Sequence, residues 1–350
     1  MQILEADKIG SATSPLNLTK TVAAVSENAS PRVGDVVVVR ALSESVTYGN
    51  LELPSGRLAK INAGDVLLGV LGKRRALKGF VGDVPERVKK GGRLHLLNMG
   101  GVIGICKGHH SALSDAIEVE VVGLACDENE TVLNIADRAL RPTNFLKTCA
   151  PVVVVAGTCM NSGKTLAATE IIKQARHAGL RVAGAKLSGV ACLRDTLNME
   201  DHGACQTASF LDCGMPSTVD AGNLAPMAKA VLNELNASEP DLIVVELGDG
   251  IVGGYAVDSI LEDEQIRAAT SAFVFCASDY VGVIGGGEVL RRLGISIDVV
   301  AGSVTDSQMG EDFVQDKLGI NAGNARRDGA RLFELVCRAN VEKQNLVPAA

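Results

Sequence analysis

Tryptophan is absent from this sequence of 350 residues, and aromatic side chains make up only 3% of it. Hydrophobic residues are 47% of the chain, so the core must be built mainly from valine, leucine, isoleucine and alanine. Aliphatic cores of this kind suit a parallel sheet that helices cover on both faces. Charged residues reach 21%, an ordinary proportion for a globular protein, and extensive disorder is therefore excluded.

An excess of positive charge is also missing. The formal net charge is -7, and no run of lysines and arginines is longer than the short clusters at 73–75 and 89–90. Such a chain has no general attraction for phosphate backbones, which argues against a nucleic-acid partner. Residues 1–15 lack an apolar signal core, and apolar runs such as 152–156 are far too short to span a bilayer. We expect a cytoplasmic protein without a membrane partner.

Cysteine pairs of the C-x-x-C type are missing too. The nine cysteines are scattered, and an odd number cannot all pair within one chain. We therefore expect reduced, buried thiols rather than metal ligands or disulfides.

Two regions of the chain differ in their hydrophobic pattern. Between residues 31 and 122, apolar runs of four to eight residues alternate with glycine-rich turns, which predicts a small antiparallel barrel or sandwich. From residue 151 onward the pattern becomes strand, loop and helix in repetition, which predicts a mostly parallel sheet flanked by helices. We expect a β-rich domain over 1–125, a linker over 126–150 with one helix near 131–139, and an α/β domain over 151–340.

The α/β domain has recognisable strands and helices. Its predicted strands are 152–156, 181–186, 242–246, 272–276 and 298–301, and its predicted helices are 165–178, 225–235 and 285–293. Ligands of such sheets bind at the carboxyl ends of the strands.

A glycine-containing loop follows the first of these strands. Here five residues separate Gly157 from the Gly163-Lys164-Thr165 sequence, whereas the usual phosphate loop has four residues in that place. Backbone N–H groups and the helix N-terminus would hold phosphate oxygens, Lys164 would neutralise the β- and γ-phosphates, and Thr165 would bind Mg²⁺. The predicted nucleotide-binding residues are Gly157, Thr158, Asn161, Ser162, Gly163, Lys164 and Thr165.

The early glycine and the segments that follow resemble dethiobiotin synthetases and the related cobyrinic acid diamide synthases. The resemblance covers about residues 151–310 in consistent order, through VAGAKLSG, MEDHGA and DLIVVELGDGIVGGY. It implies a P-loop NTPase that uses ATP and Mg²⁺. It also implies that Lys186 faces the substrate together with Ser188, that Asp201 binds the metal, and that Glu246 is the carboxylate at the end of a strand. Lys164, Lys186 and Glu246 would be the catalytic residues, with Thr165, Asp201 and Glu246 around the metal.

Each of these residues has a simpler interpretation. Lys186 could be a solvated lysine at a strand end, and Asp201 could be a helix N-cap because a helical pattern follows it. Glu246 is harder to explain without function, since a carboxylate after a buried apolar run needs a partner. Asp249 is a reserve carboxylate in the following glycine-rich loop.

Two positions depart from the family pattern. Dethiobiotin synthetases usually have Asp and Thr where this chain has Cys159 and Met160, which leaves the substrate open. Cys159 is either a reactive thiol at a helix N-terminus or a packed loop residue. No lysine lies between Gly157 and Gly163, which argues against the mechanism of the partition ATPases.

We therefore predict an ATP- and Mg²⁺-dependent enzyme of the ligase or synthetase type, which activates a carboxylate or carbamate of a small metabolite by phosphoryl transfer. The partner would be a small-molecule carboxylate or amine, and the chain would form a homodimer. A nucleotide-switched binding protein and a small-molecule kinase are the alternatives.

Overall fold

The structure is a computed structural model that describes residues 1–346, with side chains described as far as residue 341. The chain forms two compact units. Within the described residues, the first comprises 1–140, 190–194 and 210–219, and the second comprises 141–189, 195–209 and 220–346. The predicted domain boundaries near 125 and 150 stay predictions.

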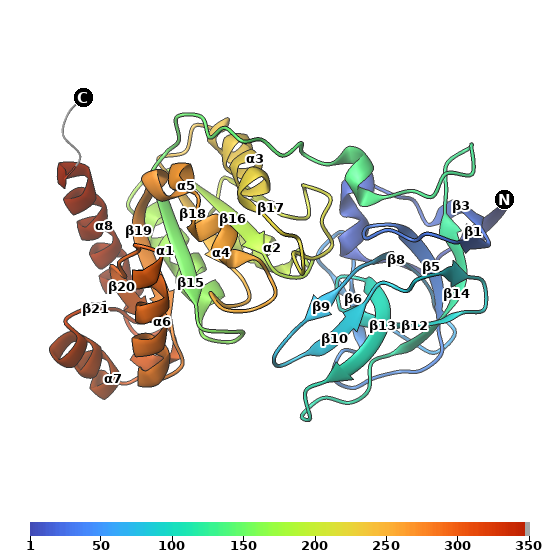
Figure 1. Cartoon of the computed structure of the whole chain (residues 1–350), viewed down its shortest axis with the longest axis horizontal. Helices are drawn as coiled ribbons and strands as arrows, with labels where there is room; N and C mark the ends of the chain where they lie inside the picture. The colour runs from blue at the N-terminus through green and yellow to red at the C-terminus, as the bar shows by residue number, and fades with distance from the viewer. Residues whose placement is uncertain (347–350) are drawn as a thin grey trace. The chain divides into compact units, whose positions relative to one another are not determined.

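The first unit is built from strands, drawn in blue to green in Figure 1. Its elements are β1 (Gln2–Glu5), β2 (Lys8–Ile9), η1 (Ser11–Leu16), β3 (Thr21–Val25), β4 (Glu27–Asn28), β5 (Val36–Ala41), β6 (Asn50–Glu52), β7 (Leu58–Lys60), β8 (Val66–Leu71), β9 (Arg74–Arg75), β10 (Phe80–Asp83), β11 (Val88–Lys89), β12 (Arg93–Asn98), β13 (Val102–His109), β14 (Glu118–Ala125) and η2 (Ile135–Arg138).

Five of these strands close into a barrel. The pairings run from β14 to β5, β8, β13 and β12 and then back to β14, and only the β8–β13 pair among them is parallel. Closure leaves no free edges on these strands, and alternate residues such as Val37, Val39 and Val119 fill the interior. The predicted β-rich, barrel-like fold is confirmed. The predicted helix over 131–139 is wrong, because only the 3-10 turn η2 forms there, capped by Asn134.

The second unit is an α/β sandwich. Its elements are β15 (Val152–Gly157), α1 (Lys164–His177), β16 (Val182–Ser188), α2 (Arg194–Asp201), β17 (Gln206–Ser209), α3 (Ala225–Asn236), β18 (Leu242–Leu247), α4 (Val257–Leu261), α5 (Glu264–Ala269), β19 (Thr270–Cys276), α6 (Tyr280–Arg292), β20 (Val299–Ala301), η3 (Ser303–Thr305), α7 (Gln308–Asp312), η4 (Phe313–Lys317), β21 (Asn321–Ala322) and α8 (Gly329–Leu346). Arg194, the first residue of α2, belongs to the first unit.

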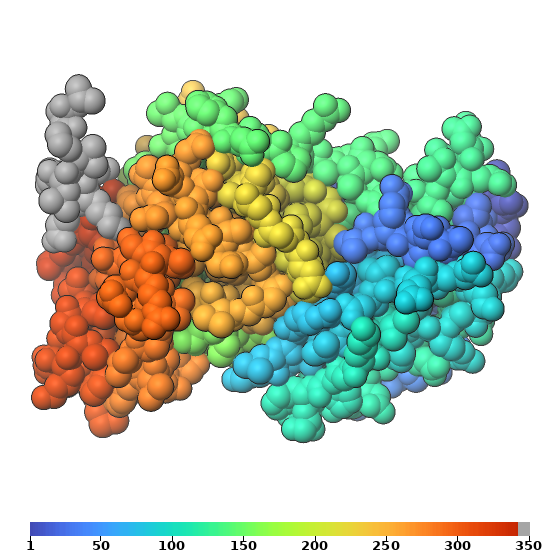
Figure 2. Space-filling view, viewed as in Figure 1, coloured from blue at the N-terminus to red at the C-terminus, as the bar shows by residue number. Residues whose placement is uncertain are grey.

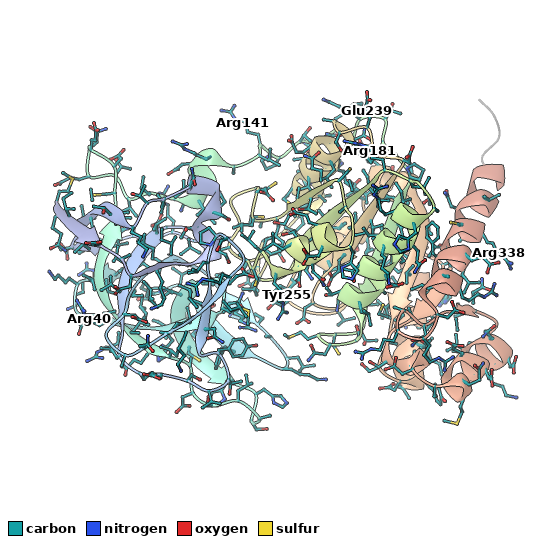
Figure 3. All side chains as sticks on the ribbon, turned by 180° about the vertical axis from the view of Figure 1, so that it is seen from behind. Arg40, Arg141, Arg181, Glu239, Tyr255 and Arg338 are labelled. Carbon is teal, nitrogen blue, oxygen red and sulfur yellow. The ribbon has the colours of Figure 1, made fainter. Side chains whose placement is uncertain are left out.

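The sheet has the order β17-β16-β18-β15-β19-β20-β21, and all of its pairings are parallel. Its strands are aliphatic and alternate between two covered faces. Val153 and Val155 face α1 and α8, whereas Val152 and Val154 face the layer that contains α3, α4 and α5. Arg181 and Glu239, which precede β16 and β18, mark the amino end of this sheet (Figure 3).

The predicted α/β architecture with its mostly parallel sheet is confirmed. All five predicted strands form within two residues of their expected bounds. The helix expected at 285–293 begins earlier, at Tyr280, because Asp279 caps it through the Gly282 amide. Within the described part of the chain, no helix is long and apolar enough to cross a membrane. None of the nine cysteines forms a disulfide, although only Cys126, Cys213 and Cys276 are buried.

Candidate nucleotide-binding site

The loop between β15 and α1 has the backbone geometry of a phosphate cradle. Asn161 and Gly163 have left-handed φ angles of 63° and 101°. A Cβ at Gly163 would also lie only 2.8 Å from the Cα of Gly302, so only glycine fits this turn comfortably. The turn delivers the chain directly into α1 at Lys164, where unpaired backbone N–H groups of a helix start favour anions.

Lys164 is buried within this cradle. Its Nζ donates hydrogen bonds to the Cys159 carbonyl at 2.7 Å and to the Asp249 carbonyl at 2.5 Å. Burial, and then the neighbouring Lys186 ammonium, lower the pKa of Lys164. A phosphate beside the Lys164 amine would supply a negative charge and so favour the protonated form of Lys164.

Glu246 of β18 is hydrogen-bonded both to the start of α1, directly after the phosphate loop, and to β16. Its Oε1 accepts hydrogen bonds from the Thr165 hydroxyl at 3.0 Å and from Lys186 Nζ at 2.6 Å. Glu246 is only 1% exposed, and Lys186 is largely buried. The structure therefore brings four predicted residues together, since Lys164 adjoins Thr165 in the chain. The solvated interpretation of Lys186 is wrong.

The second unit has the P-loop NTPase fold. The deciding arrangement is a buried parallel strand, a glycine loop and a helix that starts at Gly-Lys-Thr, with an acidic residue at the end of the adjacent strand. This fold positions Glu246 and Lys186 beside the phosphate loop because β18 is the direct neighbour of both β15 and β16.

Asp195 is a site residue that the sequence analysis missed. Its Oδ2 lies 3.0 Å from Lys186 Nζ, the same atom that contacts Glu246. Burial opposes the charge of Lys186, but Asp195 and Glu246 outweigh it and raise the pKa of Lys186. Nothing in the local pattern separates Asp195 from other acidic residues of the same helix, so only the fold could find it.

Asp201, the predicted metal ligand, lies elsewhere. It is the exposed last residue of α2, whereas Asp195 lies in the first turn. Asp201 follows Asp195 by six positions in the helix, which places the two about 9 Å apart along the axis. The structure does not bring Asp201 into the cluster around Glu246. The N-cap interpretation of Asp201 is wrong as well, because a helix ends there and the strand β17 follows.

Ser188 takes part through its hydroxyl, and Asp249 takes part through its backbone carbonyl. The Ser188 hydroxyl is buried and donates a hydrogen bond to the Gly248 carbonyl. The loop after β18 then lies directly on the phosphate loop, since Ile251 donates to the Gly157 carbonyl at 2.9 Å and a Cβ at Gly250 would lie 2.2 Å from the Thr158 carbonyl. Ser188 thus shapes the loop that touches Lys164.

Two polar atoms of the site fit a nucleotide with its metal. Ser162 Oγ and Glu246 Oε2 are buried and have no hydrogen-bond partner within the described residues. Buried polar atoms usually have partners, and phosphate oxygens or a Mg²⁺ shell would supply them. Among these residues no group of three or more His, Cys, Asp or Glu side chains could hold a metal alone. Mg²⁺ commonly takes one or two protein oxygens and completes its shell with phosphates and water, which suits Thr165 and Glu246.

Cys159 is a free, partly buried cysteine of the phosphate loop. Its thiol donates to the Met160 carbonyl at 3.3 Å, and its own carbonyl accepts from Lys164.

Comparisons with known proteins find only distant structural likenesses. No family model and no curated protein matches the chain. Among solved structures, the signal recognition particle receptor FtsY from Elizabethkingia anophelis is 11% identical with a TM-score of 0.37, and the 54 kDa signal recognition particle protein from Aeropyrum pernix is 17% identical with a TM-score of 0.37. A DUF1611 family protein from Anabaena variabilis is 13% identical with a TM-score of 0.40.

These likenesses are partial in both directions. They cover 54%, 60% and 57% of this chain and 66%, 54% and 63% of the three proteins, in the same order. Because the TM-scores are below 0.5, conclusions about this chain come from its own geometry.

Proposed function

We propose that the second unit binds ATP with Mg²⁺ and activates a carboxylate or carbamate oxygen of a small metabolite, in the manner of the dethiobiotin synthetases. The observation that carries this proposal is the contact of Thr165 and Lys186 with the same oxygen of Glu246, beside the phosphate loop. A site that only binds a nucleotide would not need a second buried lysine, Lys186, in addition to Lys164.

When bound, MgATP would supply a phosphoryl group to the acceptor oxygen, giving a mixed anhydride and ADP. In this proposal Lys164 and the loop amides hold the phosphates, and Thr165 with Glu246 holds the metal. Lys186 carries its charge because Asp195 and Glu246 stabilise it, so it can neutralise the negative charge of acceptor and phosphate.

Replacement of Lys164 tests the proposal. We expect Lys164→Ala to lower ATP turnover on the order of a hundredfold or more, because one charge that stabilises the transition state is lost. Turnover would be followed as ADP release with panels of carboxylates and amines, and folding by circular dichroism. Lys173→Ala is the matched control, since Lys173 lies on the same helix and pairs with Glu170. Turnover by the Lys164 variant at the wild-type rate would contradict the proposal.

The product separates ligation from simple phosphorylation. Mass analysis should detect a condensed product when carboxylate and amine are both present. A stable phosphorylated metabolite would instead identify a kinase.

A nucleotide-switched binding protein is the second candidate, and exposed apolar residues favour it. Val252, in the loop that contacts Lys164, is 69% exposed, and Val281 on α6 is 78% exposed. The orange segment that contains α6 lies on the visible surface in Figure 2. This candidate predicts slow hydrolysis that a protein partner accelerates and no metabolite does. The homodimer and the cytoplasmic location expected from the sequence stay predictions.

A further inference from the structure

A cavity of about 540 Å³ lies within the second unit, between its sheet and the layer that contains α3, α4 and α5 (Figure 1). Val152 and Val154 of β15 form its floor together with Val245 and Leu247 of β18. Successive side chains of a strand point to opposite faces of the sheet, so Glu246 points away from the cavity, toward Thr165 at the start of α1. The cavity and the candidate nucleotide site therefore lie on opposite faces of the sheet.

The walls of this cavity are apolar and deeply buried. The four floor residues are at most 3% exposed, and the helices above them add Leu232, Ile260 and Ile266, which are at most 4% exposed. Protein interiors contain few voids larger than a water molecule, and water needs polar partners that these walls do not offer. The volume falls within the range of roughly 300–1,000 Å³ that is typical of small-molecule sites. The space therefore fits an apolar ligand.

The floor of the cavity is long. In the register of β15 and β18, Glu246 lies opposite Val155. Leu247 is therefore level with Ala156, four positions beyond Val152, which gives the floor a length of about 13 Å at roughly 3.3 Å per residue. This length suits an extended hydrocarbon chain.

A cation lies at the mouth of the cavity. Arg267 of α5 lines the cavity and is exposed, and its Nη2 donates to the Gly294 carbonyl at 3.5 Å. Gly294 also lines the cavity, and a Cβ there would lie 3.1 Å from the same nitrogen, so the guanidinium packs directly on this turn. Within the described part of the chain, Arg267 forms no ion pair. A guanidinium without a carboxylate partner is suited to bind the carboxylate of a ligand.

Glu264 is the other charged residue that lines the cavity. It precedes Arg267 by three positions on α5, and no ion pair joins the two side chains in the structure as described. Its place in the first turn of α5, where the helix dipole favours a negative charge, explains Glu264 without a ligand. Glu264 would repel an anion at the mouth, so its removal should strengthen the binding of a carboxylate there.

We propose that this cavity is a second ligand site of the second unit and that it binds a straight-chain carboxylate. The hydrocarbon chain lies along the sheet, and the carboxylate is bound by Arg267. The site is independent of the proposed nucleotide chemistry, because no residue of the phosphate loop lines it.

Isothermal titration calorimetry of the full chain with octanoate and decanoate tests the proposal. Decanoate has two more methylene groups to bury, so its Kd should be lower on the order of tenfold, and its binding should have a negative heat-capacity change. Decylamine has the same chain and the opposite charge, and it should bind on the order of tenfold more weakly than decanoate. Failure of both acids to bind, or equal binding of decylamine, would overturn the proposal.

Substitutions at the mouth test the role of the charge. Arg267→Ala should raise the Kd of decanoate on the order of tenfold, because a charge-assisted hydrogen bond is lost, and Arg267→Lys should recover part of the affinity. Glu264→Gln should lower the Kd. Arg338→Ala is the matched control, since Arg338 is also an exposed arginine but belongs to α8 on the opposite face of the sheet. An unchanged Kd in Arg267→Ala, or an equal change in Arg338→Ala, would overturn the proposal.

Two further variants locate the bound chain. Ala268 is exposed on α5 and lines the cavity, so Ala268→Trp should obstruct the mouth and weaken decanoate binding at least on the order of tenfold without disturbing the sheet. Lys164→Ala should leave the Kd of decanoate unchanged, because Lys164 belongs to the candidate nucleotide site and does not line the cavity. Circular dichroism would confirm that both variants fold. Loss of binding in Lys164→Ala, or unchanged binding in Ala268→Trp, would place decanoate outside the cavity and overturn the proposal.

Discussion

Lys186 is a buried cation whose charge depends on two carboxylates. Burial alone would favour the neutral amine, but Asp195 and Glu246 raise the pKa of Lys186 above the usual value of 10.5. A group with a raised pKa stabilises the fold fully below its unfolded value and loses that contribution as pH rises through the folded value. Lys186 is therefore charged throughout the neutral range and supports both fold and site there.

Asp195→Asn should shift the pH dependence of turnover. Removing one of the two carboxylates leaves burial less opposed, so the pKa of Lys186 falls and the alkaline limb of kcat moves to lower pH. A pH–rate profile measures this shift. Glu200→Gln on the same helix, where Glu200 bonds Thr207, should leave the profile unchanged. An alkaline limb that stays in place would show that Lys186 is not the titrating group.

At the residue scale, the sequence predicts those site residues that lie within or beside a recognisable local pattern. Lys164 and Thr165 follow from the loop itself, and Glu246 and Lys186 from their places at the ends of buried strands. Asp195 could not be found in this way, because the chain leaves the second unit at residues 190–194 before it returns. The prediction of Asp201 rested instead on the resemblance of MEDHGA to a segment of the dethiobiotin synthetase family.

At the scale of elements, strands in the centre of the sheet were predictable because their apolar runs are continuous. The edge strand β17 was not, since it is four residues long with the sequence QTAS and only two of its residues are buried. Short edge strands depend on pairing, here with β16, rather than on their own composition. The short helices α4 and α5 were missed for a related reason. The helix α4 has five residues and no side-chain cap, and α5 has six residues and depends on its Asp263 cap and on tertiary contacts.

One such contact joins α5 to α3. Asp263 caps α5 through the amides of Gln265 and Ile266, and its other oxygen pairs with the buried Lys229 of α3 at 2.7 Å. Burial raises the pKa of Asp263, but the Lys229 hydrogen bond and the backbone amides outweigh it, and the net pKa is lowered.

Asp263→Asn should preserve the cap and lose the ion pair. We expect unfolding at pH 7 to become easier by about 2 kcal/mol, between the values for exposed and fully buried pairs. The lowered pKa means that the ion pair stabilises the protein above the usual aspartate value of 3.8 and that this contribution is lost as pH falls through the folded value. Urea unfolding at several pH values should show the difference at pH 7 and its disappearance in strong acid. A difference that persists in acid would mean that the pair is not its cause.

At the scale of the whole molecule, the segment before β15 is more ordered than its sequence indicates. The sequence predicts a polar linker over residues 126–150, yet residues 145–150 are hydrogen-bonded to α3. Asn233 exchanges hydrogen bonds with the backbone of Lys147 and Phe145, both at 2.9 Å, and Asn236 does so with Ala150 and Thr148 at 3.0 and 2.6 Å. No local pattern reveals this, because it depends on asparagines some 85 residues farther along the chain.

Limited trypsin digestion distinguishes a fastened segment from an open linker. Cleavage after Lys147 requires local opening, so the wild type should be cut there more slowly than after Lys78, which lies in an exposed turn. Asn233→Ala removes two hydrogen bonds of about 1 kcal/mol each and should speed cleavage after Lys147 on the order of tenfold to thirtyfold, since cleavage follows the population of the open form. Cleavage after Lys78 in the same sample is the internal control and should not change. Equally fast cleavage at both sites of the wild type would support the open linker predicted from composition, and residues 145–150 would then have no part in holding α3.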